Sequence, residues 1–230
     1  GWCYAKVVPL LEAAGHTVVA VDLPGHGDNP VPREEITLAA YVRHVCSVID
    51  DLQAGPEGVI LVGHSLGGVS ISQVAEDRPE KVKTLVFLAA LMPRHGESRR
   101  DLSVRLNESS ATAEAREQTA DGLAYSVRAE YVKPLFYGLC SDEDIGAARL
   151  RLVPQASEVA TAAVSLSAAR YGAVPRVYIE CLRDAAIPID IQRRMVASLP
   201  CERVLSLDTD HSPFFSAPQE LAAHLLSLAL

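Results

Sequence analysis

The chain has 230 residues, which is enough for one domain with a full hydrophobic core. Its apolar content of 49% and charged content of 22% are ordinary for a globular protein. A formal net charge of −8 without any basic cluster argues against a nucleic-acid partner, and no apolar run is long enough to cross a bilayer, so we expect no membrane partner either.

The first half of the chain alternates short helical and β-strand patterns. Apolar residues at helical spacing predict a helix over 6–14, and β-branched residues predict a strand over 17–21. A loop of turn-forming residues follows, in which we interpret Asp22 as a turn stabiliser. A second helix is expected over 38–52, with Thr37 as its N-cap. This alternation predicts an α/β fold, a mostly parallel sheet with helices on both faces.

An apolar run over 59–62 leads into Gly63-His64-Ser65-Leu66-Gly67 and then into a helical segment. A strand, a sharp turn that carries a serine and a helix together form a nucleophile elbow. We expect a strained backbone at Ser65, with Gly63 and Gly67 beside it because Cβ atoms would block the close approach of neighbouring chains. The alternative is a glycine-rich strand-to-helix turn with an ordinary serine.

The regular alternation ends after a predicted strand over 84–89. Residues 94–130 are polar and contain no predicted strand, whereas 129–152 favours a helix in two pieces, the second with a capping box from Ser141 to Asp144. We interpret 93–174 as a mainly helical cap insertion over the carboxyl edge of the sheet, between core segments 1–92 and 175–230. A pair of crossover helices with a long linker is the alternative.

The core resumes with a predicted strand over 176–181, a helix over 189–199 and a last strand over 203–207. A final helix is expected from Ser216, where Ser216 and Gln219 match a capping box, to the end of the chain. Candidate residues for a substrate pocket are His64 and the apolar members of the insertion, Leu135, Phe136, Tyr137 and Leu139. Packing within the cap is an equal alternative for the four residues of the insertion.

A serine nucleophile needs a base, and the base needs an acid that orients it. Among seven histidines, only His211 lies in a loop directly after a late core strand; a histidine that satisfies loop backbone is the alternative. Asp184 directly follows a core strand, where an aspartate can also cap a helix. Ser65 would attack an acyl carbonyl while His211 accepts its proton. The Leu66 backbone N–H would supply half of the oxyanion hole, the other half coming from the loop after the first strand.

Cysteine usage gives no sign of a metal site. The five cysteines are odd in number and lack the spacing of metal ligands: Cys3, Cys46, Cys140, Cys181 and Cys201. We interpret them as small buried groups in a reducing compartment such as the cytoplasm. We expect neither a metal nor a cofactor.

Four stretches carry a family resemblance: GWCYAKVVPLLEAAGHTVVAVDLPGHG, VILVGHSLGG, VFLAALMP and TDHSPFFSAPQELAAHL. They resemble the α/β-hydrolase superfamily, in particular the group of plant methylesterases, hydroxynitrile lyases and related bacterial esterases. By that resemblance Ser65, Asp184 and His211 match the triad positions, and Leu66 matches the oxyanion donor. The resemblance implies an α/β-hydrolase fold and acyl-serine chemistry.

The chain departs from this family in two places. Members normally have a strand and an H-G-containing loop just before the G-W of this sequence, so we expect such a segment upstream, with the second oxyanion donor. The hydroxynitrile lyases carry a lysine directly after the catalytic histidine, where this chain has Ser212. Cyanide chemistry is therefore not expected.

The sequence favours a carboxylic ester hydrolase that acts on a small or medium acyl substrate. One alternative is an acyltransferase or thioesterase-like cyclase, in which the substrate's own hydroxyl or amine intercepts the acyl-serine. Another is a non-catalytic small-molecule receptor on the same fold. The expected partner is a small-molecule ester or acyl compound, and the sequence carries no signal for the oligomeric state.

Overall fold

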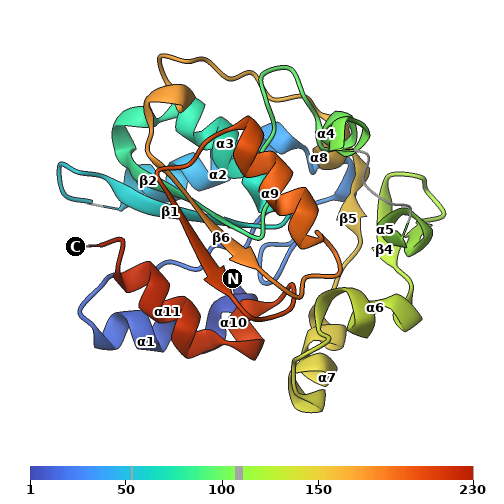
Figure 1. Ribbon diagram of the computed structural model, residues 1–230. Helices are drawn as coiled ribbons and strands as arrows, with labels where there is room; N and C mark the ends of the chain where they lie inside the picture. The colour runs from blue at the N-terminus through green and yellow to red at the C-terminus, as the bar shows by residue number, and fades with distance from the viewer. Residues whose placement is uncertain (53, 107–110, 230) are drawn as a thin grey trace.

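A four-stranded parallel sheet lies at the centre of the molecule (Figure 1). The computed structural model describes all residues except 53, 107–110 and 230. The strands are β1 (Val59–His64), β2 (Val82–Leu88), β6 (Arg176–Cys181) and β7 (Arg203–Leu207), and they are adjacent in this order. All three strand pairs are parallel, which confirms the α/β architecture expected from the sequence.

The side chains of the sheet alternate between two hydrophobic clusters. On β2, Leu85 and Phe87 belong to one cluster and Val86 and Leu88 to the other, because successive side chains of a strand point to opposite faces. Helices α2 (Leu38–Asp51), α3 (Gly67–Asp77) and α9 (Ile189–Ser198) cover the first face. Helices α1 (Val8–Ala13), α10 (Pro213–Ser216) and α11 (Pro218–Leu226) cover the second. Both faces are therefore buried, as predicted.

The helix ends show which capping predictions hold. Thr37 Oγ1 accepts a hydrogen bond from the Ala40 backbone N–H at 3.0 Å and caps α2 as predicted. The predicted helix over 6–14 is observed as α1, and the short turn η1 (Trp2–Lys6) precedes it. The predicted capping box at Ser216 and Gln219 is wrong, since Ala217 is the N-cap of α11 and Pro218 begins it. The Ser216 hydroxyl instead donates to the Asp210 carboxylate at 2.7 Å.

The predicted strand over 17–21 is not part of a ladder. Strand β1 is an edge of the four-stranded sheet, and residues 17–21 and 59–62 line the same cavity. The prediction fails because a β-branched sequence forms a strand only where a neighbouring strand completes its backbone hydrogen bonds, and among the described residues none does so here.

All elements between β2 and β6 belong to the predicted insertion. They are α4 (Arg99–Leu106), α5 (Ala111–Glu114), β3 (Arg116–Gln118), β4 (Ala124–Val127), α6 (Ala129–Phe136), α7 (Asp142–Arg151), β5 (Gln155–Ala156), α8 (Ser157–Thr161) and η4 (Tyr171–Ala173). Two further 3₁₀ turns, η2 (Arg33–Glu35) and η3 (Pro79–Lys81), lie in the first half of the chain. Ser141 caps α7 as predicted, with its hydroxyl accepting from the Asp144 N–H at 3.1 Å.

The absence of a strand over 94–130 was a wrong prediction. Strands β3 and β4 form an antiparallel pair, and β5 extends it to a three-stranded sheet. The turn between β3 and β4 has Gly122 at φ +71°. The β3–β4 pair could not be predicted from the sequence because its residues are mostly polar and partly exposed. They therefore lack the alternation of apolar and polar residues that marks a half-buried strand.

The insertion packs on the core as well as on itself. Val132, Tyr137, Ile145 and Ala148 form a small cluster between α6 and α7, whereas Val159 and other apolar residues of the insertion join the larger core cluster. The division into core and cap stays a prediction.

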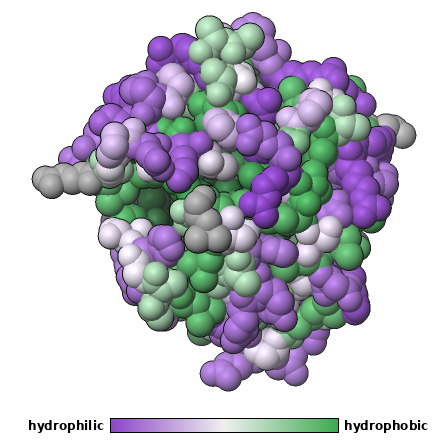
Figure 2. All heavy atoms as spheres, turned by 60° about the vertical axis from the view of Figure 1, so that its left-hand side comes forward, coloured by the Kyte–Doolittle hydropathy of each residue, from purple (hydrophilic) through white to green (hydrophobic). Residues whose placement is uncertain are grey.

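No helix in the described part of the chain has the length and apolar character of a membrane span. On the face shown in Figure 2, hydrophilic residues surround a hollow lined by hydrophobic ones.

Candidate active site

Ser65 lies in a left-handed turn between β1 and α3. Its φ is +53°, which confirms the strained backbone expected at a nucleophile elbow. The Ser65 backbone N–H donates to the Leu88 carbonyl at 3.3 Å, and the Ser65 carbonyl accepts from the N–H groups of Gly68 at 3.2 Å and Leu91 at 3.0 Å. The turn is therefore held between the end of β2 and the first turn of α3. Ala89, at φ +40°, is a second strained residue beside it that the sequence did not indicate.

The glycines around Ser65 differ in what they make possible. A Cβ at Gly63 would lie 2.9 Å from the Gly67 carbonyl oxygen, so the close approach predicted there is confirmed. The same prediction for Gly67 is wrong, because a Cβ at that position meets nothing within 4 Å. The tight contact falls instead at Gly68, where a Cβ would lie 2.1 Å from the Leu91 carbonyl oxygen.

His211 and Asp184 are brought together from loops that follow β7 and β6. His211 Nδ1 lies 2.7 Å from Asp184 Oδ2, and both side chains are almost fully buried. The carboxylate can only accept, so Nδ1 of a neutral His211 carries the proton and Nε2 is left as the acceptor. No described residue forms a hydrogen bond with Nε2. The structure thus brings the side chains of His211 and Asp184 into contact, with one ring nitrogen of His211 left for another partner.

The Asp184 carboxylate is fixed by a set of buried donors. Its Oδ1 accepts from the backbone N–H groups of Ala186 at 2.7 Å and Ile187 at 2.8 Å. Gln192, fully buried on α9, donates to the Ile187 carbonyl at 2.7 Å and lies 3.5 Å from Asp184 Oδ2. The helix that follows has Pro188 as its N-cap, so Asp184 does not cap it. Gln192 was missed in the sequence, where a buried glutamine on an amphipathic helix looks like a surface residue.

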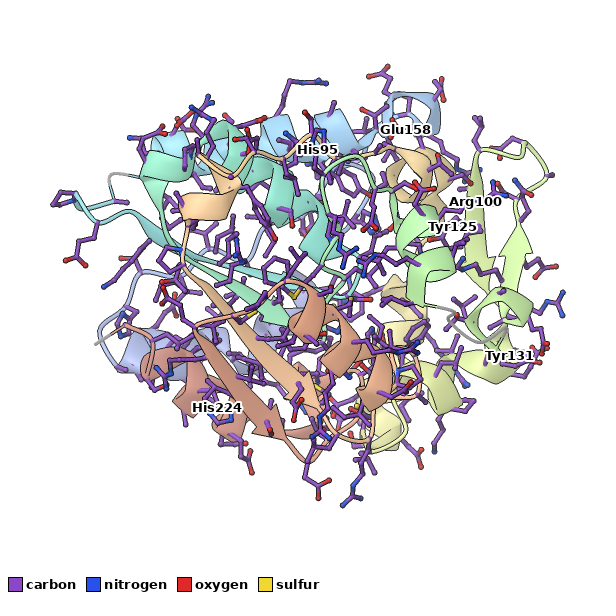
Figure 3. All side chains as sticks on the ribbon, turned by 45° about the horizontal axis from the view of Figure 1, so that its top comes forward. His95, Arg100, Tyr125, Tyr131, Glu158 and His224 are labelled. Carbon is purple, nitrogen blue, oxygen red and sulfur yellow. The ribbon has the colours of Figure 1, made fainter. Side chains whose placement is uncertain are left out.

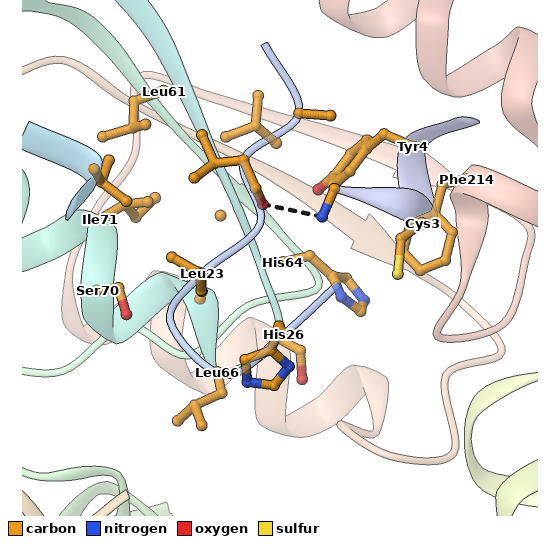
Figure 4. A pocket seen from close by; sticks show the side chains of 18 of the residues that line it. Cys3, Tyr4, Leu23, His26, Leu61, His64, Leu66, Ser70, Ile71 and Phe214 are labelled. Atoms are coloured by element: carbon orange, nitrogen blue, oxygen red, sulfur yellow. Dashed lines mark hydrogen bonds between the residues drawn. The ribbon is translucent and has the colours of Figure 1, made fainter. Parts of the chain in front are cut away.

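His64 packs directly on His211. Its Nε2 lies 2.7 Å from the His211 backbone carbonyl, and the two rings are 4.5 Å apart between centroids. Since a carbonyl only accepts, Nε2 of His64 carries a proton and donates it. Burial, followed by the electrostatic effect of the neighbouring His211 ring, holds the pKa of His64 well below its ordinary value, so His64 stays neutral. The ring also meets Phe214 edge-on, a neighbour that Figure 4 shows beside the pocket.

Asp210 links the His211 loop to the insertion. Its carboxylate accepts from the Leu139 backbone N–H at 2.7 Å, the Ser212 backbone N–H at 3.1 Å and the Ser216 hydroxyl at 2.7 Å. Asp210 is only 3% exposed. Asp210 has no signal in the sequence, because nothing there shows that Leu139 lies opposite it.

A cavity of about 1740 Å³ lies beside Ser65 and His211. Ser65, Leu66 and His211 line it, together with the predicted pocket residues His64, Leu135, Phe136 and Tyr137. Leu139, also predicted for the pocket, is not among the described residues that line it; its backbone N–H bonds to Asp210 instead. Phe136 brings the insertion to the site, with its ring centroid 5.5 Å from that of His211. The cavity exceeds the usual size of small-molecule sites because it continues along β1 to residues 17–21.

The backbone N–H of Leu66, the N-cap of α3, has no acceptor among the described residues. It is therefore available to a ligand in the cavity. Its role and the second oxyanion donor stay predictions.

Two other histidines are engaged elsewhere. His95 Nδ1 accepts from the Leu166 backbone N–H at 3.1 Å, and His224 Nε2 lies 3.1 Å from the Ser206 carbonyl. Neither lines the cavity, and Figure 3 shows them on different parts of the molecule. Within the described ranges, no group of three or more His, Cys, Asp or Glu side chains is arranged to hold a metal ion.

The alpha/beta hydrolase family model matches residues 1–224. The chain belongs to the α/β-hydrolase family. It is 38% identical to Methylesterase 7 of Arabidopsis thaliana over 99% of this chain and 91% of that protein, and 34% identical to Salicylic acid-binding protein 2 of Nicotiana tabacum over 100% and 92%. The crystal structure of polyneuridine aldehyde esterase superposes with a TM-score of 0.88 at 29% identity, covering 100% of this chain and 94% of that one.

These similarities extend over both halves of the core and over the insertion. They confirm the predicted α/β-hydrolase fold and the resemblance to the plant methylesterase group. The chain is a serine ester hydrolase of the α/β-hydrolase type, as the nucleophile elbow indicated.

Proposed function

We propose that Ser65, His211 and Asp184 form the catalytic triad of this ester hydrolase. The observation that carries the proposal is the 2.7 Å bond from His211 Nδ1 to Asp184, which leaves Nε2 as a proton acceptor beside the cavity that Ser65 also lines. Asp184 would hold the tautomer of His211 and stabilise the imidazolium that forms. His64 and Asp210 fix the backbone of the same loop and act through it.

The reaction proceeds in two steps, formation of an acyl-serine and its hydrolysis. Ser65 Oγ attacks the ester carbonyl carbon while its proton passes to His211 Nε2, and the carbonyl oxygen becomes an oxyanion that accepts from the Leu66 N–H. The intermediate collapses, and the leaving alcohol takes the proton from His211. Water then attacks the acyl-serine with the same proton relay, which releases the carboxylic acid and restores Ser65. The step needs no metal or cofactor.

The substrate in this proposal is an ester of a small or medium carboxylic acid. The names of the curated relatives support a methyl ester, and the apolar side chains of Leu135, Phe136 and Leu66 support an acyl group with a hydrocarbon surface. The five cysteines form no disulfide, which supports the further proposal of a reducing compartment such as the cytoplasm.

An active-site phosphonate and p-nitrophenyl acetate test the triad on the intact protein. We expect the phosphonate to label Ser65, located by peptide mass spectrometry, and Ser65→Ala to lose at least about 10⁴-fold in turnover while it keeps the fold. Ser72→Ala is the matched control, because that hydroxyl is buried in α3 on the Gly68 carbonyl at 2.7 Å. In the Ser72→Ala variant the phosphonate should still label Ser65.

The same experiment separates the other functions of this fold. Labelling of Ser65 with little hydrolysis would identify an acyltransferase or cyclase that protects its acyl-serine from water. No labelling would identify a receptor and contradict the triad. Undiminished turnover in Ser65→Ala would contradict the role of Ser65.

A further inference from the structure

His26 is a polar group on the cavity wall that the triad does not use. It lies in the tight loop after residues 17–21, between Gly25 at φ +79° and Gly27 at φ +55°. A Cβ at Gly25 would lie 2.2 Å from the Ile36 side chain, and one at Gly27 would lie 2.2 Å from the Asp22 carboxylate. The Asp22 carboxylate also accepts from the Asp28 N–H at 3.0 Å, the turn-stabilising role predicted for it. The backbone on both sides of His26 is therefore fixed.

A hydrogen-bond chain determines which nitrogen of His26 carries its proton. Gln155 Nε2 lies 3.3 Å from the Tyr41 hydroxyl and 3.4 Å from the Ala156 carbonyl, which orients the amide with its NH₂ toward both. Tyr41 thus accepts from Gln155. Its own hydrogen points to His26 Nε2, 2.7 Å away. The opposite arrangement would leave the hydroxyl hydrogen of Tyr41, a residue 2% exposed, without an acceptor.

With Nε2 as the acceptor, a neutral His26 carries its proton on Nδ1. Burial lowers the pKa of His26, so the ring is neutral at pH 7. No described residue forms a hydrogen bond with Nδ1, and Nδ1 is not among the buried side-chain atoms without a partner. Nδ1 is therefore not sealed in the interior of the protein, and the His26 ring lines the cavity. Figure 4 shows the His26 ring at the same part of the pocket as Leu66, the residue whose N–H faces the reacting ester in the proposed mechanism.

We propose that His26 Nδ1–H binds an acceptor oxygen of the substrate, so that the preferred esters carry an ether or carbonyl oxygen besides the ester group itself. This specificity role rests on the proposed function, because it requires that the ester occupies this cavity. Most of the neighbouring lining is hydrocarbon, including Leu23, Leu66 and Ile71. A fixed donor among such hydrocarbon groups discriminates strongly between ligands that differ by one oxygen.

Matched ester pairs measure this preference. p-Nitrophenyl methoxyacetate and p-nitrophenyl butyrate differ in their acyl chains only by an oxygen in place of a methylene. 2-Methoxyethyl and n-butyl benzoate differ in the same way on the alcohol side. The ratio of kcat/KM within a pair, compared between variant and wild type, cancels the intrinsic reactivity of the esters. The two pairs also show which side of the ester His26 contacts.

Three substitutions at His26 separate its two nitrogens. His26→Phe removes both, His26→Gln keeps a group near the position of Nε2, and His26→Asn keeps an N–H near the position of Nδ1. We expect Phe and Gln to lower the ratio for the oxygen-bearing ester about five- to tenfold in at least one pair, the loss of one neutral hydrogen bond. Asn should retain most of the preference. His224→Asn, at a histidine on α11 outside the cavity, is the control and should leave both ratios unchanged.

Ratios within twofold of wild type in His26→Phe, for both pairs, would overturn the proposal. Equal losses in the Asn and Gln variants would also overturn it, since ring packing and not the Nδ1 proton would then set the preference. Either result is distinct from a failure of the triad, which is judged by the labelling and turnover of Ser65→Ala.

Discussion

His64 lies next to Ser65 in the chain but bonds to the main chain of His211. It is a neutral donor in a buried position, and its pKa is well below the ordinary histidine value. The two histidines of the site therefore differ in role. His211 presents a ring nitrogen to the cavity, whereas His64 holds the backbone of His211 in place.

His64→Gln should make the free energy of unfolding less dependent on pH in the acid range. The folded pKa of His64 lies below its unfolded value of about 6.5, so between these values the unfolded chain binds one more proton and the free energy of unfolding falls as the pH is lowered. The slope from this one group is at most about 1.4 kcal/mol per pH unit. Glutamine does not titrate and removes this contribution.

Urea unfolding at several pH values between 7.5 and 5.5 measures the difference. His26 also has a lowered pKa, so it too lowers the free energy of unfolding in acid. Its contribution is the same in wild type and in His64→Gln and cancels from the comparison. Parallel pH dependences of wild type and His64→Gln would contradict the assignment of His64 as a buried neutral histidine.

At the scale of elements, the approach of α3 to the segment after β2 depends on Gly68. Gly68→Ala should lower the free energy of unfolding by about 2 kcal/mol or more, because its Cβ would lie 2.1 Å from the Leu91 carbonyl and that backbone also bonds Ser65. Gly67→Ala is the matched control and should be neutral or slightly stabilising, since its Cβ meets nothing within 4 Å. The midpoints of urea unfolding measure the stability of both variants. Equal losses of stability at the two positions would contradict the role of Gly68.

The contact between the insertion and the β7–α10 loop depends on Asp210. Asp210→Asn replaces an acceptor oxygen by an NH₂ group that faces N–H donors, so we expect a loss of about 2–3 kcal/mol in unfolding free energy together with a lower kcat. Asp208→Asn is the control, because Asp208 pairs with Arg183 at the surface, where both side chains are more than half exposed. It should change stability by less than about 0.5 kcal/mol. Comparable losses in the two variants, by chemical denaturation, would contradict the role of Asp210.

At the scale of the whole molecule, the packing on both faces of the sheet encloses all five thiols to some degree. Burial raises the pKa of Cys3 to about 11, of Cys140 to about 12 and of Cys201 to about 11, and the pKa values of Cys46 and Cys181 are raised as well. The thiolate is the reactive form. Native protein at pH 7.5 should therefore react slowly with iodoacetamide, and urea-unfolded protein should react at all five positions. Rapid alkylation of the native state, followed by mass spectrometry, would contradict this.

Local patterns in the sequence predicted most of the core. The strands β1, β2, β6 and β7 and the helices α2 and α9 lie where apolar periodicity placed them, because burial on the two faces of a sheet requires that periodicity. Ser65 was identifiable from its own turn, since the glycine before it and the strand and helix around it are neighbours in the chain. His211 and Asp184 were found by position at strand ends, and their pairing then followed from the parallel order of the strands.

Contacts between distant segments could not be predicted in this way. The bond from Leu139 to Asp210, the role of Gly68 and the chain from Gln155 through Tyr41 to His26 join residues that are separated by 71, 23 and up to 129 positions, and none has a local signal. The same reason explains the failed strand over 17–21, because a ladder depends on the neighbour and not on propensity. The sequence by itself determined the sheet, the nucleophile turn and the chemistry at the strand ends; only tertiary structure decided which groups hold that chemistry in place, since those contacts arise from packing between elements.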